Sequence, residues 1–128
     1  MTNKKILLAD DEPQLALAIK IRLQSRGYQV TTASDGRQAL DAIAKERPDL
    51  VLLDVLMPVM DGYQLYHLLK EQPRTKHVPV IMVTGGGDLP DQALGLEAPA
   101  YNYVTKPVRV DELLQKIRAV LPATPPPA

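Results

Sequence analysis

The chain has 128 residues, of which 45% are hydrophobic, so one globular domain with its own core is expected, and the composition argues against a disordered chain. Its 15 basic and 15 acidic side chains give a formal net charge of zero, which argues against direct binding to nucleic acid. Cysteine is absent, which excludes disulfides, and the apolar run of residues 6–9 is too short for a signal peptide or a membrane span, so we expect a cytoplasmic protein.

The first predicted elements are a strand, a helix and a second strand. Residues 6–9 form an unbroken apolar run, typical of a strand that is covered on both faces. The segment between Pro13 and Gly27 has a pattern that fits a strand almost as well as a helix. Its length and its two boundary residues favour a helix. A short strand is predicted at residues 29–33.

A second helix and the most apolar strand follow. Ser34 or Asp35 can cap the helix, whose apolar positions are helically spaced, and Pro48 ends it. Residues 50–53 are all aliphatic and stop at Asp54, which predicts a buried strand with a carboxylate at its end.

The rest of the chain continues the alternation of helices and strands. The remaining predicted elements are a helix after Gly62, a strand at 80–83 that stops at Thr84, a short weak helix between Pro90 and Pro99, a strand at 101–104, and a last helix marked by apolar residues from Val110 to Leu121. Five βα units of this length predict an α/β fold, a parallel sheet with helices on both faces.

The expected fold is a doubly wound, flavodoxin-like sheet with the strand order 2-1-3-4-5, which is one of the common orders among known folds of this class. We expect one domain over residues 1–121. Residues 122–128 are rich in proline and alanine and are interpreted as a tail or the start of a linker.

Polar residues lie at or just after the carboxyl ends of the first, third, fourth and fifth predicted strands, and the second strand contributes none. In a parallel sheet these ends share one edge, so the side chains there should converge. The residues concerned are Asp10, Asp11, Asp54, Thr84 and Lys106. Each alone has an ordinary explanation, since a single Asp after a strand is most often a turn or cap residue. Their joint pattern is what points to a site.

The predicted cluster has the composition of a phosphoryl-transfer site. Three carboxylates repel one another, and a hard divalent cation with oxygen ligands relieves that repulsion, which favours Mg²⁺. Asp54 lies among large aliphatic residues, where an ionised carboxylate is costly unless it is paired. Such a site can hold a phosphoryl group with Asp54 as nucleophile, while Lys106 and the metal neutralise charge on its oxygens.

Five motifs in order give the chain a resemblance to the receiver domains of bacterial two-component response regulators, from about Lys5 to Leu121. They are Asp10–Asp11–Glu12–Pro13, Asp54–Val55–Leu56–Met57–Pro58, Asp61–Gly62, Thr84, and Tyr103–Val104–Thr105–Lys106–Pro107.

The resemblance implies a role for each matching residue. Asp54 would accept a phosphoryl group from a sensor histidine kinase or a histidine phosphotransfer protein. Asp10, Asp11, Asp54 and the backbone carbonyl of Leu56 would hold Mg²⁺. Lys106 would contact the phosphoryl oxygens, Thr84 would bond to one of them, and Tyr103 would be the switch aromatic. Such a domain catalyses only its own phosphorylation and dephosphorylation, and it switches the face around helix 4, strand 5 and helix 5.

The sequence departs from the winged-helix subfamily that Gly95–Leu96–Glu97 resembles. Gln92 stands where that subfamily has an arginine, and Tyr101–Asn102 stands where it has paired acids. Those charges serve the subfamily's dimer face, so we expect a monomer before phosphorylation. The segment Gly85–Ala98 contains three consecutive glycines and is expected to be the least stable part of the fold.

Three other functions remain as alternatives. A phosphohydrolase of the haloacid-dehalogenase type needs a second Asp two residues after the nucleophile, but position 56 is Leu. A flavin-binding module needs a phosphate loop after the first strand, where this chain has acids. A receiver that no longer takes a phosphoryl group and only binds proteins is disfavoured by the complete set of residues. The output that the domain controls does not follow from the sequence.

Overall fold

The computed structural model describes residues 4–54, 62–84, 103–105 and 108–121. For five of these residues it describes only the backbone: Gly62, Tyr63, Thr84, Tyr103 and Thr105. The short helix expected between Pro90 and Pro99, the segment Gly85–Ala98 and the tail at 122–128 lie outside the described residues.

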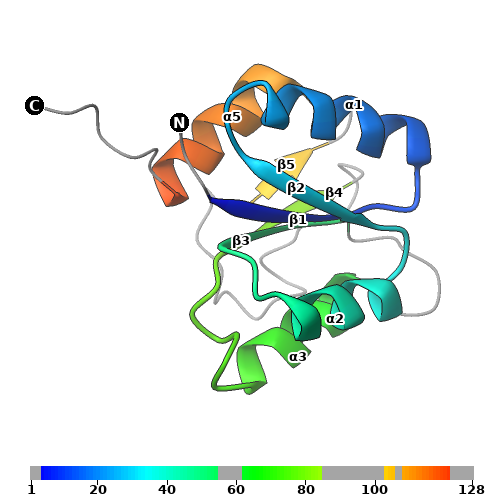
Figure 1. The fold of residues 1–128 in the computed structure, drawn as a ribbon, viewed down its shortest axis with the longest axis vertical. Coiled ribbons are helices and arrows are strands. Elements are labelled where there is room, and N and C mark those ends of the chain that lie inside the picture. Colours follow the sequence, from blue (N-terminus) through cyan, green and yellow to red (C-terminus); the bar gives the residue numbers. More distant parts are fainter. Residues whose placement is uncertain (1–3, 55–61, 85–102, 106–107, 122–128) are drawn as a thin grey trace, which may run out of the picture.

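The centre of the fold is a five-stranded parallel sheet with the order β2-β1-β3-β4-β5, so the predicted order is confirmed (Figure 1). The strands are β1 (Lys5–Ala9), β2 (Gln29–Ala33), β3 (Leu50–Asp54), β4 (Val80–Thr84) and β5 (Tyr103–Thr105). All four neighbouring pairs are parallel. Their carboxyl ends therefore share one edge of the sheet.

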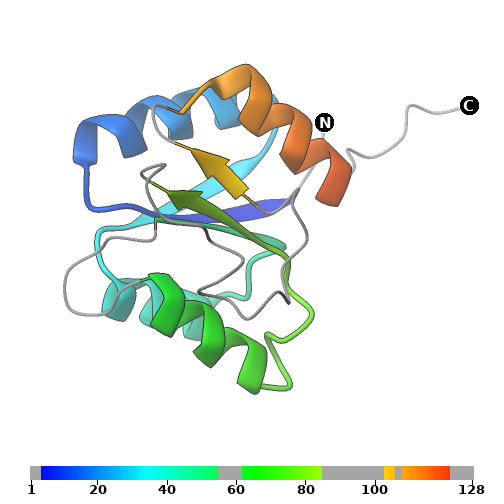
Figure 2. The same cartoon turned by 180° about the vertical axis from the view of Figure 1, so that it is seen from behind.

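The helices cover the sheet in two layers. Figures 1 and 2 show α1 and α5 on one face and α2 and α3 on the other. Their bounds are α1 (Pro13–Gln24), α2 (Gly36–Lys45), α3 (Gly62–Glu71) and α5 (Val110–Val120). None of the described helices is long and apolar enough to cross a membrane.

The central strand β3 is buried along its whole length because both of its faces are covered. Its side chains alternate between the two layers. Val51 and Leu53 pack with the core under α2 and α3, whereas Leu50 and Leu52 pack with the core under α1 and α5. The unbroken apolar run at residues 50–53 is thus explained, because this one strand contributes side chains to two cores.

The boundary residues of α1 act as predicted. Pro13 is the first residue of the helix, where the missing N–H costs no hydrogen bond. Past its other end, Gly27 has a φ of 94°, a left-handed conformation that favours glycine, so the chain can turn into β2.

Of the two candidate caps for α2, Asp35 is the residue that caps the helix. The Asp35 carboxylate accepts a hydrogen bond of 2.8 Å from the backbone N–H of Gln38. Ser34 contributes differently, because its N–H and its hydroxyl both donate to Gln38 Oε1 at 2.9 Å.

A few boundaries differ from the prediction. The helix α2 already ends at Lys45, before Pro48, and Gly62 is the first residue of α3 and does not precede it. In the described residues β5 runs from Tyr103 to Thr105, one residue past the predicted end.

The connection from α3 to β4 is held by a lysine side chain. Lys70 Nζ donates to the carbonyl oxygens of Lys76, at 3.3 Å, and Val78, at 3.1 Å. Partial burial lowers the pKa of the Lys70 ammonium. These bonds tie the last turn of α3 to the entry of β4 and so help to place the strand that ends at Thr84.

Candidate functional site

Two buried aspartates lie side by side at the carboxyl edge of the sheet. Asp54 is the last residue of β3, and Asp10 directly follows β1. Ala9 is the register partner of Leu53, so the next residue on each strand is one of the two aspartates. Each is only 3% exposed. The convergence predicted from the sequence is therefore confirmed for this pair.

Two more carboxylates join them. Asp10, Asp11, Glu12 and Asp54 each offer a carboxylate oxygen, and these atoms all lie within 4.8 Å of one another. Asp11 and Glu12 are exposed, so the cluster has a buried side and an open side. Glu12 was not among the ligands expected from the sequence, although it is the third acid in the run before Pro13.

Local hydrogen bonds fix the turn that carries three of these acids. The N–H of Asp10 donates to the carbonyl oxygen of Ala33 at 2.9 Å, which holds the residue against β2. Asp10 Oδ1 accepts from the N–H of Glu12 at 2.8 Å, a bond two residues along the chain that is typical of an Asx turn. The carbonyl oxygen of Glu12 then accepts from Ala16 N and begins α1. The turn is thus built from the strand end and the helix start together.

The donor set fits a hard divalent cation. All the clustered ligand atoms are carboxylate oxygens, which Mg²⁺ and Ca²⁺ prefer over nitrogen or sulfur. Four carboxylates this close repel one another when they are ionised, and a cation removes that repulsion. The exposed side formed by Asp11 and Glu12 leaves room for the water molecules that Mg²⁺ retains.

The other predicted site residues are only partly within the described part of the chain. Thr84 ends β4 and follows Val83, the register partner of Asp54, so its backbone lies at the expected edge. Tyr103 begins β5 and pairs with Met82, further from that edge. Leu56 and Lys106 lie outside the described residues. No side-chain contact is described for any of these four residues.

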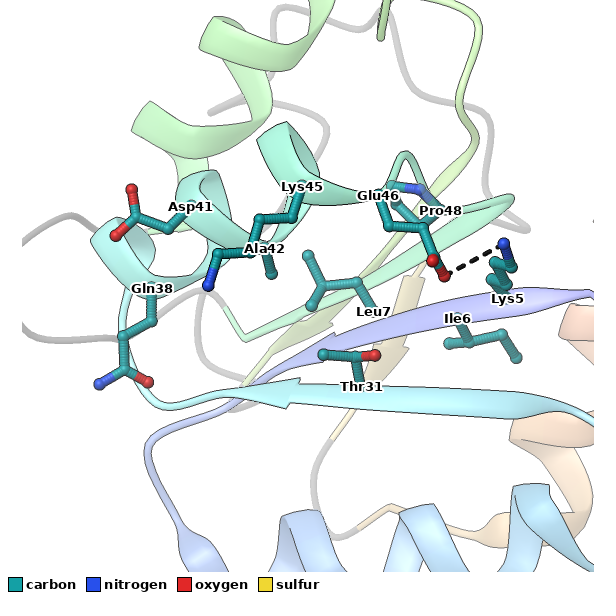
Figure 3. Close-up of a pocket in the computed structure, with 10 residues that line it drawn as sticks. All are labelled: Lys5, Ile6, Leu7, Thr31, Gln38, Asp41, Ala42, Lys45, Glu46 and Pro48. Atoms are coloured by element: carbon teal, nitrogen blue, oxygen red, sulfur yellow. Dashed lines mark ion pairs between the residues drawn. The ribbon is translucent and has the colours of Figure 1, made fainter.

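A concave surface of about 390 Å³ adjoins the acidic cluster between α1 and β2. Its lining includes Asp10 and, from α1, the residues Pro13, Leu17 and Lys20. A second cavity, of about 480 Å³, lies between α2 and the strands β1 and β2 and contains none of the four acids (Figure 3). Of these two cavities, only the smaller borders the candidate site.

Comparison with known sequences places the chain among signalling proteins. Residues 6–118 match the family model of the response regulator receiver domain. The chain is 44% identical over 123 residues to the probable transcriptional regulator ycf27 of Guillardia theta, covering 96% of this chain and 47% of that protein. It is 40% identical over 119 residues to the alkaline phosphatase synthesis transcriptional regulatory protein PhoP of Bacillus subtilis, covering 93% and 49%. The chain thus spans about half the length of these relatives.

Solved structures that resemble this chain are also response regulators or receiver domains. The chemotaxis response regulator CheY4 of Vibrio cholerae superposes with a TM-score of 0.84 at 33% identity, covering 94% of this chain and all of that one. The receiver domain of the sensor histidine kinase PA1611 of Pseudomonas aeruginosa, solved with a magnesium ion coordinated in the active site cleft, has a TM-score of 0.80 at 32% identity, covering 91% and 96%. This chain therefore belongs to the family of response regulator receiver domains.

Proposed function

We propose that the chain is the phosphoacceptor of a two-component phosphorelay and that Asp54 takes the phosphoryl group. The observation that carries the proposal is the position of Asp54, buried at the end of the central strand and within reach of three other carboxylates. Burial and neighbouring like charges both disfavour the ionised form of a carboxylate, so this position points to a functional role for Asp54. Receiver domains accept a phosphoryl group on an aspartate, and this role would explain why a carboxylate is buried here despite its energetic cost.

The transfer is a substitution at phosphorus. A carboxylate oxygen of Asp54 attacks the phosphorus atom of a phosphohistidine, the bond from phosphorus to the imidazole nitrogen breaks, and the electron pair stays on the imidazole. Asp10, Asp11 and Asp54 would hold Mg²⁺, with Glu12 beside them and with the carbonyl oxygen of Leu56 as a further ligand. When bound, the ion supplies positive charge against the carboxylates and the phosphoryl oxygens. Lys106 would add a second positive charge.

The proposed switch follows from the same residues. Thr84 would bond to a phosphoryl oxygen once Asp54 is modified, and Tyr103 would respond on the neighbouring strand. Because β4 and β5 pair directly, a shift at Thr84 can bias the face that β5 and α5 form. The domain would thus signal by a change of its surface and would not turn over a substrate. We place it in the cytoplasm and assign residues 1–121 to it, with 122–128 as a tail or linker.

The proposed partner is a sensor histidine kinase or a histidine phosphotransfer protein. Leu17 and Ile21 are large apolar side chains on α1 that are 57% and 55% exposed. They are four residues apart, so they share one face of the helix. Leu17 also lines the concave surface that borders Asp10. An apolar pair beside the acceptor site suits a phosphodonor that packs a helix against α1.

The proposal is tested by labelling with a small phosphodonor. Asp54→Asn keeps the shape of the side chain but removes its nucleophilic oxygen, so labelling by acetyl phosphate with Mg²⁺ should fall to background. Asp111→Asn is a matched control, since Asp111 lies in the first turn of α5, outside the acidic cluster. Stoichiometric labelling of Asp54→Asn, with an unchanged circular dichroism spectrum, would move the acceptor elsewhere.

A further inference from the structure

The strand β2 has an open edge in the described part of the chain. Among the described strands it is the last of the sheet, and its one partner there is β1. Gln29 N donates to the carbonyl oxygen of Lys4, and the carbonyl oxygen of Ala33 accepts from Asp10 N, so these two residues bond toward β1. Along a parallel strand successive residues bond to opposite sides. The N–H and C=O groups of Val30 and Thr32 therefore point to the open edge.

Within the described residues, the strand at the open edge carries neither a charged side chain nor a proline of its own, although Lys20, Asp41 and Lys45 line the hollows beside it. Edge strands are commonly protected by charged side chains, proline or a covering element. The segment Gln29–Ala33 contains neither a charge nor a proline. No hydrogen bond among the described residues uses the outward groups of Val30 and Thr32. The backbone groups of this edge are therefore available to another strand.

The two cavities leave both faces of this strand accessible. Thr31 lines the cavity of about 480 Å³ beneath α2, where Figure 3 shows it beside Leu7 on the sheet. Thr32 lines the concave surface of about 390 Å³ on the α1 side. Both threonines are exposed. A strand that approaches the edge therefore finds room for its side chains on either face of the sheet.

We propose that a second copy of this chain pairs with the open edge through its own β2, in antiparallel orientation, about a two-fold axis at Thr31. In this register Val30 lies opposite Thr32 of the partner subunit, and Thr32 lies opposite Val30 of the partner subunit. Residues that face each other as a hydrogen-bonded pair exchange both of their backbone bonds. Every outward N–H and C=O group of Val30 and Thr32 is then satisfied.

The occupant is a second copy because the edge is complementary to itself. Val30 and Thr32, whose backbone N–H and C=O groups point away from β1, lie on either side of Thr31. A two-fold axis at Thr31 therefore places each of them opposite the other one in the second copy. The two Thr31 residues meet as a non-hydrogen-bonded pair, in which side chains are close, and Thr–Thr pairs of this kind are favourable. Three successive β-branched residues, Val30 to Thr32, suit an extended strand.

The pairing is weak and depends on concentration. Each backbone hydrogen bond contributes about 0.5–1.5 kcal/mol net, and association must offset the loss of translational and rotational freedom. The dilute chain is then a monomer, in line with the expectation from the sequence, and the dimer forms as the concentration rises. The edge used is β2, at the opposite end of the sheet from β5.

Single cysteines test the register, because the chain has no cysteine of its own. In the proposed dimer the Cα atoms of the two Thr31 residues lie about 4.5 Å apart, within the range that a disulfide spans. Thr31→Cys should therefore form a covalent dimer in oxidised glutathione, at least tenfold faster than Thr32→Cys. Gln115→Cys, on the exposed side of α5, reports the rate of random collision. Equal rates for all three variants would overturn the proposal, and faster linkage of Thr32→Cys would overturn its register.

A second measurement avoids the disulfide. Sedimentation velocity of the unmodified chain should show a sedimentation coefficient that increases with protein concentration. Thr31→Lys places like charges opposite each other at the axis and should abolish this increase, whereas Thr31→Val should retain it. Circular dichroism checks that both variants are folded. A sedimentation coefficient of the unmodified chain that does not change up to millimolar concentration would show that the edge does not pair with itself.

Discussion

Asp10 lies level with Asp54 across the β1–β3 pair, because each follows a residue of the register pair Ala9–Leu53. Both carboxylates are buried, and both belong to a cluster with two further acids. Two buried charges of the same sign at one strand end repel each other, and this repulsion opposes folding. The site should therefore be a local cost to stability that a bound cation removes.

This relationship leads to a prediction for Asp10→Asn. In the absence of Mg²⁺ the variant should melt at a higher temperature than the unmodified chain, because one of the repelling charges is gone. Mg²⁺ should raise the melting temperature of the unmodified chain, by an amount equivalent to about 2.7 kcal/mol at a hundred times its Kd. The variant should lose most of this increase. Calorimetry with and without Mg²⁺ measures both effects, and an undiminished Mg²⁺ effect in Asp10→Asn would contradict a shared carboxylate site.

A second prediction concerns the cap of α2. Asp35→Ala removes the acceptor of the Gln38 N–H and should lower the free energy of unfolding by about 1 kcal/mol. Asp35→Ser retains an acceptor oxygen and should recover most of that loss. Urea denaturation measures the difference. Because Asp35 is outside the acidic cluster, the response to Mg²⁺ should not change; a lost Mg²⁺ response in Asp35→Ala would show that the β2–α2 turn contributes to the ion site.

A third prediction separates modification from switching. Thr84→Ala should still be labelled on Asp54, because Thr84 is not the nucleophile. Addition of beryllium fluoride and Mg²⁺, which mimic the phosphoryl group, should shift the amide resonances of β5 and α5 in the unmodified chain. Those shifts should be much smaller in Thr84→Ala, and Thr84→Ser should restore them. Equal shifts in all three proteins would exclude Thr84 from the switch.

The sequence was sufficient to predict the elements that carry the site, because each has an independent signal. Pro13 and Gly27 bound α1, the aliphatic run before Asp54 marks β3, and the topology rule for parallel sheets brings the strand ends together. The strand order itself came from known folds, since no residue pattern determines which strands are neighbours.

Other features depend on contacts that a linear pattern does not contain. Glu12 joins the cluster because Asp10 Oδ1 accepts its N–H and folds the turn back, a bond that only the geometry reveals. Ser34 and Asp35 were equal candidates as the cap, since both side chains carry an acceptor oxygen. Leu17 and Ile21 fit a helical apolar pattern as well as the buried Ile19 does, so their exposure could not be predicted.

The exposed pair on α1 leads to the last prediction. If Leu17 and Ile21 receive the phosphodonor, Leu17→Ala with Ile21→Ala should slow phosphotransfer from the cognate histidine kinase or phosphotransfer protein by tenfold or more, because large apolar anchors carry much of the binding energy at such surfaces. Labelling by acetyl phosphate should not change, since a small donor needs only the acidic site. The double variant should also remain folded, because both side chains are already more than half exposed.

Gln24→Ala is the matched control for this experiment, since Gln24 is an exposed polar residue at the end of the same helix. It should leave both reactions unchanged. Loss of labelling by both donors in the double variant would mean that α1 has moved and the acidic turn with it. Unchanged transfer from the kinase would place the docking surface elsewhere. Slowed transfer from the kinase together with normal labelling by acetyl phosphate is the only outcome that assigns α1 to recognition and leaves Asp54 with the chemistry.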